Sequence, residues 1–229
     1  MAEFGDGQPL EQLKLMWDEL KEVPCDMKRG AAVVCDSLAY VNSLGSHDVF
    51  AYDSKKDNWN KLPECPHREF GLAAINDLLT AVGGWSDGEF TTCLSSFDGS
   101  KWLTVFPPMP TKRQLPAVIS TQNYLIVAGG IAVGQALSTV DVMDMNTREW
   151  FTAASLPECV CFMSATVCEG RLYLLGGLDK NWTSGPMQSS PAPWTSSFTH
   201  VTRPHPTVVK TMSGNVSLMY QWTALLVLP

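Results

Sequence analysis

The sequence predicts an all-β fold assembled from repeated units, and three observations support this prediction. Three Gly-Gly pairs each end an apolar run, at Gly83-Gly84, Gly129-Gly130 and Gly176-Gly177. The pairs lie 46 and 47 residues apart, and a fixed period of this length is typical of repeat architectures. A tryptophan follows each pair at a similar distance. A chain built in this way is expected to carry its function on loops rather than in one buried pocket.

The repeat extends over three segments, at residues 30–63, 71–110 and 115–157. Each segment contains two short apolar stretches joined by a polar turn. An aromatic residue or Met followed by Asp comes next, then a Trp, and a Leu-Pro or Met-Pro ends the unit. The aspartate pairs are Tyr52-Asp53, Phe97-Asp98 and Met143-Asp144, and the tryptophans are Trp59, Trp102 and Trp150.

Short apolar runs between turn residues predict strands, and regularly spaced short strands predict an all-β architecture. Four antiparallel strands in a period of about 45 residues match one blade of a β-propeller. Residues 17–24 predict a closing strand ahead of the first blade, and residues 163–177 predict the start of a further blade. Leu172, Tyr173, Leu174 and Leu175 are expected to form the contact between the third and fourth blades, with little ordered sheet after Gly177. Residues 1–16 form a short N-terminal segment, and residues 178–229 form a divergent C-terminal tail.

Each signature residue has a physical reason. Glycine within a strand pattern indicates a positive φ or the close approach of another backbone, so the Gly-Gly pairs predict crowding near the central channel. Tryptophan supplies a large buried area between neighbouring sheets. The aspartate suits the turn that follows it, because its carboxylate can accept hydrogen bonds from nearby backbone N–H groups.

The ordered set of apolar run, Gly-Gly, aromatic-Asp, Trp and Leu-Pro resembles the kelch repeat over residues 17–177. The first unit departs from this pattern, because Ser43-Leu44-Gly45 stands where the Gly-Gly pair belongs. The resemblance implies kelch-type blades in a β-propeller used mainly for protein binding. It also implies substrate recognition for a cullin-type ubiquitin ligase, which kelch proteins join through a BTB or F-box domain. Residues 1–16 are too short to form either domain.

Three to four blades predict an incomplete or open propeller, because propellers close with four to eight blades and kelch propellers usually with about six. An open arc exposes strand edges, which favours self-association. The chain is therefore interpreted as a fragment or isoform of a longer protein, and the alternative is closure by association. Residues 186–229 are expected to be loosely packed. The alternative for the tail is a decayed fourth blade, since Trp194 and Arg203 keep the spacing of Trp59 and Arg68.

Composition favours a folded cytoplasmic module. The net charge of −7 and a pI near 5.0 argue against nucleic acid as a partner. No signal peptide and no apolar run of about 20 residues is visible, which argues against a membrane. Cys159-Val160-Cys161 suggests a thiol sensor or a soft-metal site, but packing of small hydrophobic side chains is the favoured interpretation. No cofactor and no metal are expected.

The arginines of the inter-blade linkers are the predicted partner-binding residues. Arg29, Arg68 and Arg113 each follow a closing proline, and His67 lies beside Arg68 as a further rim residue. The kelch resemblance implies that arginines at this position hold acidic peptide groups, and a guanidinium fork binds a carboxylate through two hydrogen bonds. The alternative is that these arginines bond backbone carbonyl groups between blades.

Enzymatic interpretations find little support in the residues. A copper-oxidase propeller needs converging Tyr and His ligands, and the four histidines have no matched spacing. A sialidase-like site would use an arginine cluster with a tyrosine nucleophile. No phosphate-binding glycine loop, Gly-x-Ser-x-Gly or His-Glu-x-x-His motif occurs. The sequence therefore predicts a non-catalytic protein-interaction module, with a propeller enzyme of the sialidase or copper-oxidase type as the alternative.

Overall fold

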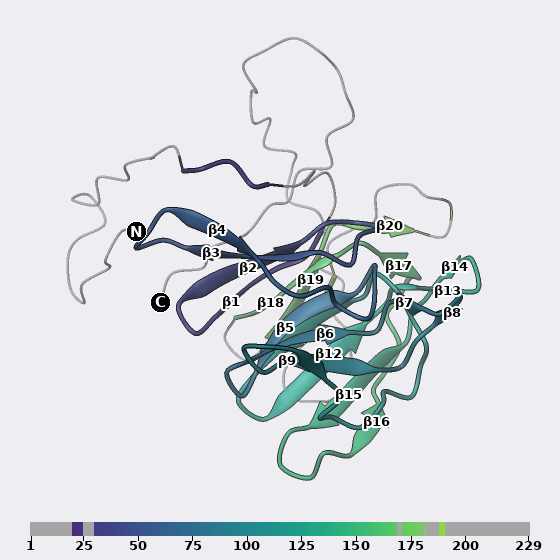
Figure 1. Cartoon of the computed structure of the whole chain (residues 1–229). Helices are drawn as coiled ribbons and strands as arrows, with labels where there is room; N and C mark the ends of the chain where they lie inside the picture. Colours follow the sequence, from purple (N-terminus) through teal and green to yellow (C-terminus); the bar gives the residue numbers. More distant parts are fainter. Residues whose placement is uncertain (1–19, 25–29, 169–170, 180, 182–187, 191–229) are drawn as a thin grey trace, which may run out of the picture.

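The computed structural model describes residues 20–24, 30–168, 171–179, 181 and 188–190, and every regular element in these ranges is a β-strand (Figure 1). Successive sheets stand beside one another in chain order. Their innermost strands β1, β5, β11 and β18 are neighbours in that sequence. The all-β prediction with antiparallel four-stranded blades is confirmed.

Three sheets have four strands and the fourth has three among the described residues. The first contains β1 (Ala32–Cys35), β2 (Leu38–Asn42), β3 (Val49–Asp53) and β4 (Asn58–Lys61). The second contains β5 (Gly71–Ile75), β6 (Leu78–Val82), β9 (Leu94–Phe97) and β10 (Trp102–Leu103). The third contains β11 (Ala117–Ser120), β12 (Tyr124–Ala128), β15 (Val140–Asp144) and β16 (Trp150–Thr152), and the fourth contains β18 (Ser164–Cys168), β19 (Arg171–Leu175) and β21 (Gln188–Ser190).

The first two strands of a sheet are joined by a tight turn. In the first and second sheets the two turn residues have positive φ, at Asp36 and Ser37 (47° and 63°) and at Asn76 and Asp77 (49° and 60°). Two successive residues with positive φ produce the hairpin turn whose twist matches that of the flanking strands. The polar turns predicted from the sequence therefore fix the antiparallel register.

The core consists of separate apolar layers between neighbouring sheets. Along β12, Leu125 and Val127 pack toward the second sheet, whereas Ile126 and Ala128 pack toward the fourth. Both faces of the strand are buried, so alternate residues contribute to two different layers. Leu172 and Leu174 of β19 join the layer between the third and fourth sheets, as predicted. Tyr173 and Leu175 were expected there as well, but as alternate residues of β19 they point to its other face.

The signature Trp and Asp residues act as predicted. The indole N–H of Trp102 donates to the Pro63 carbonyl of the preceding unit (2.8 Å), and that of Trp150 donates to Pro107 (3.1 Å). The carboxylate of Asp98 accepts from the backbone N–H of Ser100 (2.9 Å), and those of Asp53 and Asp144 accept in the same way from Lys55 and Asn146. Neighbouring sheets are therefore joined by one indole hydrogen bond in addition to apolar packing.

Each Gly-Gly pair combines positive φ with close backbone approach. Gly129 and Gly130 have φ of 59° and 96°. A Cβ on Gly129 would lie 2.3 Å from the Val160 carbonyl oxygen, and one on Gly130 would lie 2.7 Å from that of Gln114. Any larger residue would therefore displace the neighbouring linkers.

The first unit replaces the Gly-Gly function with a side chain. Asn42 is buried, its carbonyl oxygen lies against Gly30, and its Nδ2 donates to the Phe70 carbonyl of the next linker (3.3 Å). Its Oδ1 accepts from the backbone N–H of Ala31 (2.6 Å). An asparagine amide thus supplies the contact to the next linker that glycine backbone makes elsewhere.

The two ends of the chain differ in part from the predictions. Residues 20–24 are described and contain no strand, although Lys21 accepts from the Trp59 indole (2.9 Å), as expected of a preceding unit. Little sheet was expected after Gly177, yet β21 adds a third strand to the fourth sheet by pairing with β19. Residues 1–19, Arg29 and residues 191–229 lie outside the described ranges. Self-association through the ends of the arc stays a prediction.

Candidate functional site

The connecting segments gather at one end of the sheets and form what we call the loop face. It comprises the linkers 64–70, 111–116 and 158–163 and three small two-stranded elements. These are the hairpin of β7 (Trp85–Ser86) and β8 (Glu89–Phe90), the hairpin of β13 (Ile131–Ala132) and β14 (Gln135–Ala136), and the pair of β17 (Val160–Cys161) with β20 (Leu178–Asp179). Figure 1 shows these six strands together at one end of the molecule.

Backbone pairing fixes each linker to the element beside it. The N–H of Arg68 donates to the Trp85 carbonyl (3.0 Å), and the N–H of Trp85 donates back to Arg68 (2.8 Å). Gln114 and Ile131 make the same two bonds at 2.9 and 2.8 Å, and β17 pairs with β20 at the corresponding place. Arg68 and Gln114 are therefore equivalent positions of the repeat.

The residue before each of these positions points inward and anchors its linker. The Nδ1 of His67 lies 2.8 Å from the Gly83 carbonyl oxygen, and its Nε2 lies 2.8 Å from the Ser95 hydroxyl. We call His67 and Arg113 the anchor residues, because Arg113 bonds the equivalent carbonyl of Gly129 (2.8 Å). Both side chains are buried, with 3% and 0% of their surface exposed.

The Arg113 anchor carries a buried ion pair. Its Nη2 donates to Asp141 Oδ2 (2.5 Å) and to the Thr139 hydroxyl (3.0 Å), and its Nη1 donates to the Thr139 carbonyl (3.0 Å). The Thr152 hydroxyl donates to the other Asp141 oxygen (3.0 Å). Burial lowers the pKa of Arg113 while Asp141 opposes that shift, and the guanidinium remains charged at neutral pH because its ordinary pKa is so high.

These positions correct the predicted arginine site. Arg113 is not accessible to a partner at the rim of the blades. Its guanidinium is fully buried and bonded to backbone carbonyls within its own blade and to Asp141. His67 is likewise buried and is not a rim residue. Arg29 lies outside the described residues. Of the four predicted residues, only Arg68 is seen exposed on the loop face.

Arg68 lies next to an aromatic pair that the sequence analysis missed. Trp85 and Phe90, both partly exposed, meet edge to face with their ring centroids 4.8 Å apart. Within the part of the chain that the structure describes, the Arg68 guanidinium has no hydrogen bond or ion pair. The hairpin itself has a sequence signal, since Asp87-Gly88 between Trp85 and Phe90 is a strong two-residue turn.

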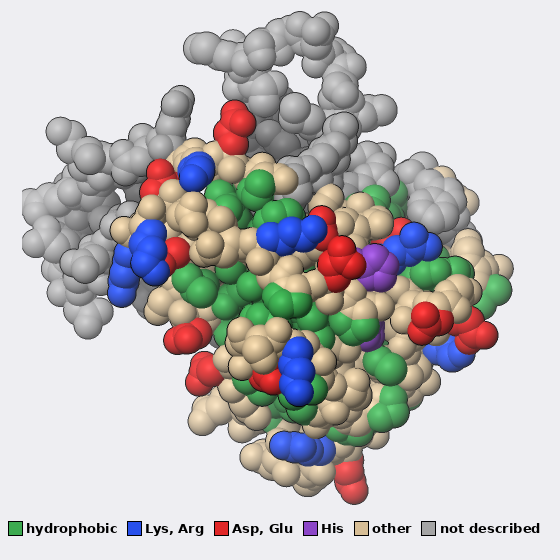
Figure 2. All heavy atoms as spheres, in the orientation of Figure 1, with side chains coloured by type: hydrophobic (Ala, Val, Ile, Leu, Met, Phe, Trp, Pro, Cys, Tyr) green, Lys and Arg blue, Asp and Glu red, His purple; other side chains and the backbone are tan. Residues whose placement is uncertain are grey.

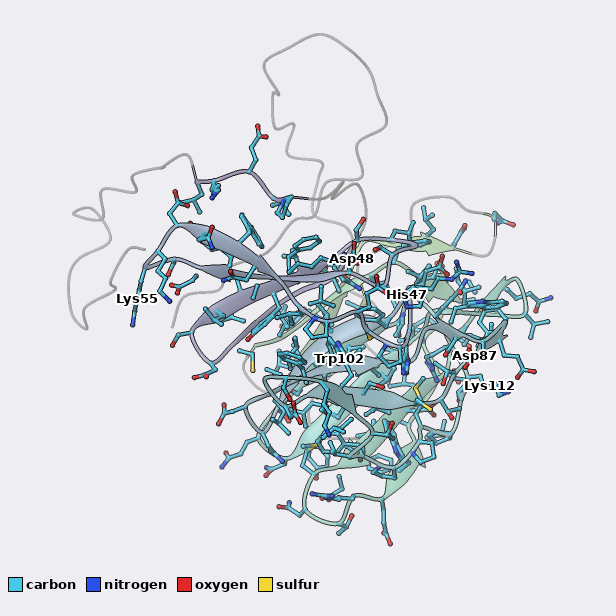
Figure 3. All side chains as sticks on the ribbon, viewed as in Figure 1. His47, Asp48, Lys55, Asp87, Trp102 and Lys112 are labelled. Carbon is cyan, nitrogen blue, oxygen red and sulfur yellow. The ribbon has the colours of Figure 1, made fainter. Side chains whose placement is uncertain are left out.

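Charges of both signs surround this cluster. Lys112 pairs with Glu89 across the second linker (3.0 Å), and both side chains are exposed. Figure 3 shows Asp87 and Lys112 close together on the right of the view, Lys55 on the far left, and His47 and Asp48 between them. In the view of Figure 2 acidic and basic side chains are interspersed. A partner would therefore be recognised by individual contacts rather than by a field of one sign.

For Cys161, the structure supports the interpretation as a small hydrophobic side chain packed in the interior. Cys161 is fully buried, packs with Ile131 and Leu178, and contacts the Leu178 carbonyl through its sulfur (3.6 Å). Burial raises the pKa of the Cys65 thiol to about 12. Among the described residues no group of three or more His, Cys, Asp or Glu side chains is arranged to hold a metal ion. None of the described residues belongs to a helix that is long and apolar enough to span a membrane.

Comparison with known proteins agrees with this geometry. A family model described as Kelch motif matches residues 112–157. The chain is 25% identical over 187 residues to alpha-scruin of Limulus polyphemus, covering 72% of this chain and 20% of that protein. It is 28% identical over 130 residues to Kelch-like protein 35 of Mus musculus, covering 56% and 22%.

Two further similarities extend the comparison. The chain is 23% identical over 158 residues to the Kelch repeat and BTB domain-containing protein 1 of Cowpox virus (strain Brighton Red), covering 64% of this chain and 27% of that protein. The solved structure of YjhT superposes with a TM-score of 0.67 at 18% identity, covering 81% of this chain and 75% of that chain. At this identity the second similarity concerns the fold alone.

The fold, the repeated Gly-Gly and Trp contacts and these similarities define a protein built of kelch-type β-propeller blades. These similarities support a kelch-repeat family for this chain. It spans between 20% and 27% of the length of the curated relatives named above.

Proposed function

We propose that this chain is a non-catalytic protein-binding module whose loop face contacts the partner. The observation that carries the proposal is the cluster of Arg68, Trp85 and Phe90 on that face. Tryptophan and arginine are enriched among the residues that dominate binding energy at protein interfaces. Its kelch-repeat relatives support a protein-interaction role in general.

The cluster favours a partner segment that joins an acidic side chain to an apolar one. An exposed guanidinium can hold a carboxylate through two charge-assisted hydrogen bonds. The partly exposed rings of Trp85 and Phe90 offer an adjacent apolar surface, and the backbone bonds between Trp85 and Arg68 fix its position beside the linker that carries the guanidinium. A preformed surface loses little conformational entropy on binding. We infer that an acidic peptide group binds at Arg68, and that Arg113 supports the blade from within.

We further propose that the module recognises substrates for a ubiquitin ligase. Support for this step comes from the similarity to a protein named for kelch repeats together with a BTB domain. In such an assembly the loop face would hold the substrate, and the ligase would be recruited by a different domain.

Site-specific photo-crosslinking tests the loop face. A photo-crosslinking amino acid at position 87 should form an adduct with a partner protein, whereas the same residue at position 55, at the opposite end of the sheets, should not. Mass spectrometry of the adduct identifies the partner segment, which is then made as a synthetic peptide. Equal crosslinking at positions 87 and 55 would contradict the proposal.

Calorimetry with that peptide tests the role of Arg68. The Arg68→Ala variant should bind at least tenfold more weakly, a loss of about 1.4 kcal/mol. The matched control is Gln114→Ala, at the equivalent position of the next linker, which should change binding by less than about 0.5 kcal/mol. Unchanged affinity in Arg68→Ala, with circular dichroism confirming the fold, would remove Arg68 from the site.

A further inference from the structure

The two anchor residues bond equivalent glycine carbonyls, but one is a histidine and the other an arginine. His67 and Arg113 are 46 residues apart, as are the carbonyls of Gly83 and Gly129 that they bond. The outer partner also changes: the strand residue opposite Ala81 is Ser95, and the residue opposite Val127 is Asp141. A histidine with a serine thus stands where the next blade has an arginine with a carboxylate.

The hydrogen bonds define the neutral state of His67. A carbonyl oxygen can only accept, so Nδ1 carries the proton that is donated to Gly83. The Nε2 of the neutral ring then accepts from the Ser95 hydroxyl. At Arg113 the anchor is a permanent cation and Asp141 balances its charge. Among the residues that the structure describes, no carboxylate bonds His67 in this way.

The groups around His67 disfavour a positive charge. Burial is the main cause that lowers its pKa below the ordinary value, the nearby His47 acts in the same direction, and the Gly83 carbonyl opposes them. His47 belongs to the segment before β3, and the Cys65 thiol and the exposed Arg68 lie on the same linker as His67. Glu69 follows Arg68 on that linker, and Asp48 beside His47 is already paired with Lys61 (2.8 Å).

We infer that His67 is a pH-sensitive positioning residue that holds Arg68 on the loop face at neutral pH and releases it in acid. Protonation places an uncompensated cation in a buried site, and opening of the linker exposes it to water. The opened linker has an ordinary histidine pKa near 6.5, whereas the closed linker has a lower one. The closed state is therefore fully stable above about pH 6.5 and loses stability as the pH falls below it. The linker of Arg113 has no group that titrates in this range.

Local hydrogen exchange in the full chain tests this inference without any partner. The amides of Arg68 and Trp85 report on the first linker, and those of Gln114 and Ile131, in the equivalent bonds, serve as the internal control. After correction for intrinsic exchange rates, the opening constant at the first pair should rise by up to about tenfold per pH unit below 6.5. At the second pair it should stay unchanged. An equal change at both pairs, or none at Arg68, would overturn the inference.

Variants of the residue that bonds the His67 ring provide a second test of the inference. Ser95→Asp introduces the carboxylate of the next blade and should raise the His67 pKa above 6.5, as followed by NMR of the imidazole ring. Ser95→Asn is the uncharged control of similar size and should leave that pKa low. His47→Gln should keep the pH dependence at Arg68, which excludes His47 as its source. If Ser95→Asp does not fold, the wild-type exchange data and the His67 titration decide alone, and a His67 pKa at or above 6.5 refutes the inference.

The effect of pH on partner binding rests on the proposed function. If Arg68 binds the acidic segment found by crosslinking, affinity for that peptide should fall between pH 7 and pH 5.5, and the fall should be absent in His67→Arg/Ser95→Asp. Failure of peptide binding at every pH would count against the proposed function only, because the hydrogen-exchange result does not depend on it. A pH-independent affinity with pH-dependent exchange would show that the anchor titrates without controlling binding.

Discussion

Replacing Arg113 by methionine should destabilise the protein more than any other single change on the loop face. Methionine keeps much of the side-chain volume but removes the charge and every hydrogen-bond donor. Within the described residues, Asp141 would then be left as a buried carboxylate with the Thr152 hydroxyl as its one side-chain donor. The carbonyls of Gly129 and Thr139 would lose donors at the same time.

Removing one partner of a buried ion pair costs about 3–5 kcal/mol. Native domains unfold with about 5–15 kcal/mol, so Arg113→Met should lose at least about a fifth of the stability. The double variant Arg113→Met/Asp141→Leu should recover at least about 2 kcal/mol of that loss, since it no longer buries an unpaired charge. Lys112→Met is the matched control, because its ion pair with Glu89 is exposed and contributes about 0–1 kcal/mol.

Urea unfolding followed by tryptophan fluorescence and circular dichroism gives these free energies, with equal m-values confirming that the same structure unfolds. A loss below about 1 kcal/mol in Arg113→Met, together with a coupling energy near zero, would refute the reasoning. Arg113 would then not be the anchor of its linker, and its assignment as a peptide-binding residue would regain support.

Two further predictions concern the scaffold. Gly130→Ala should lower the melting temperature far more than Gly134→Ala, because both residues have positive φ but only a Cβ on Gly130 meets the Gln114 carbonyl; similar shifts in the two variants would show that crowding is not the cause. In thiol labelling of the native chain at pH 8, followed by mass spectrometry, Cys65 should react much more slowly than Cys159, since its raised pKa of about 12 leaves almost no thiolate. Comparable labelling of both thiols would contradict the described burial.

The elements predicted from the sequence are those whose pattern follows from local chemistry. Apolar runs, polar turns and the Gly-Gly period predicted an all-β fold with antiparallel four-stranded sheets, and the turn role of Asp98 needed only its own neighbours. Contacts that depend on another blade were not predictable in the same way. That Asn42 replaces a glycine pair depends on the position of the Phe70 carbonyl, to which no sequence motif points.

The predicted arginine site failed in part because its positions were counted from the closing prolines. The segment after a proline varies in length, so Pro63 precedes Arg68 by five residues and Pro110 precedes Arg113 by three. Counted from the Gly-Gly pairs, whose geometry is fixed by backbone contacts, Arg113 aligns with His67 and Arg68 aligns with Gln114. The equivalence of these positions could be read from the sequence, but only by counting from the Gly-Gly pairs. The segment after the closing proline differs in length between units, so counting from the proline aligns residues that are not equivalent.

Arg68 and Arg113 differ in burial because they occupy adjacent, not equivalent, positions of the repeat. Successive residues of an extended segment point to opposite sides, so the anchor at 67 or 113 points inward while its neighbour at 68 or 114 points outward. The backbone at the outer position is already bonded to the adjacent hairpin, whatever its side chain. Arginine and glutamine occupy this position at residues 68 and 114, whereas the equivalent Cys161 is buried against Ile131 and Leu178. Stability is therefore carried by the inward residues and the backbone, which leaves the exposed side chain of Arg68 available for the proposed partner contact.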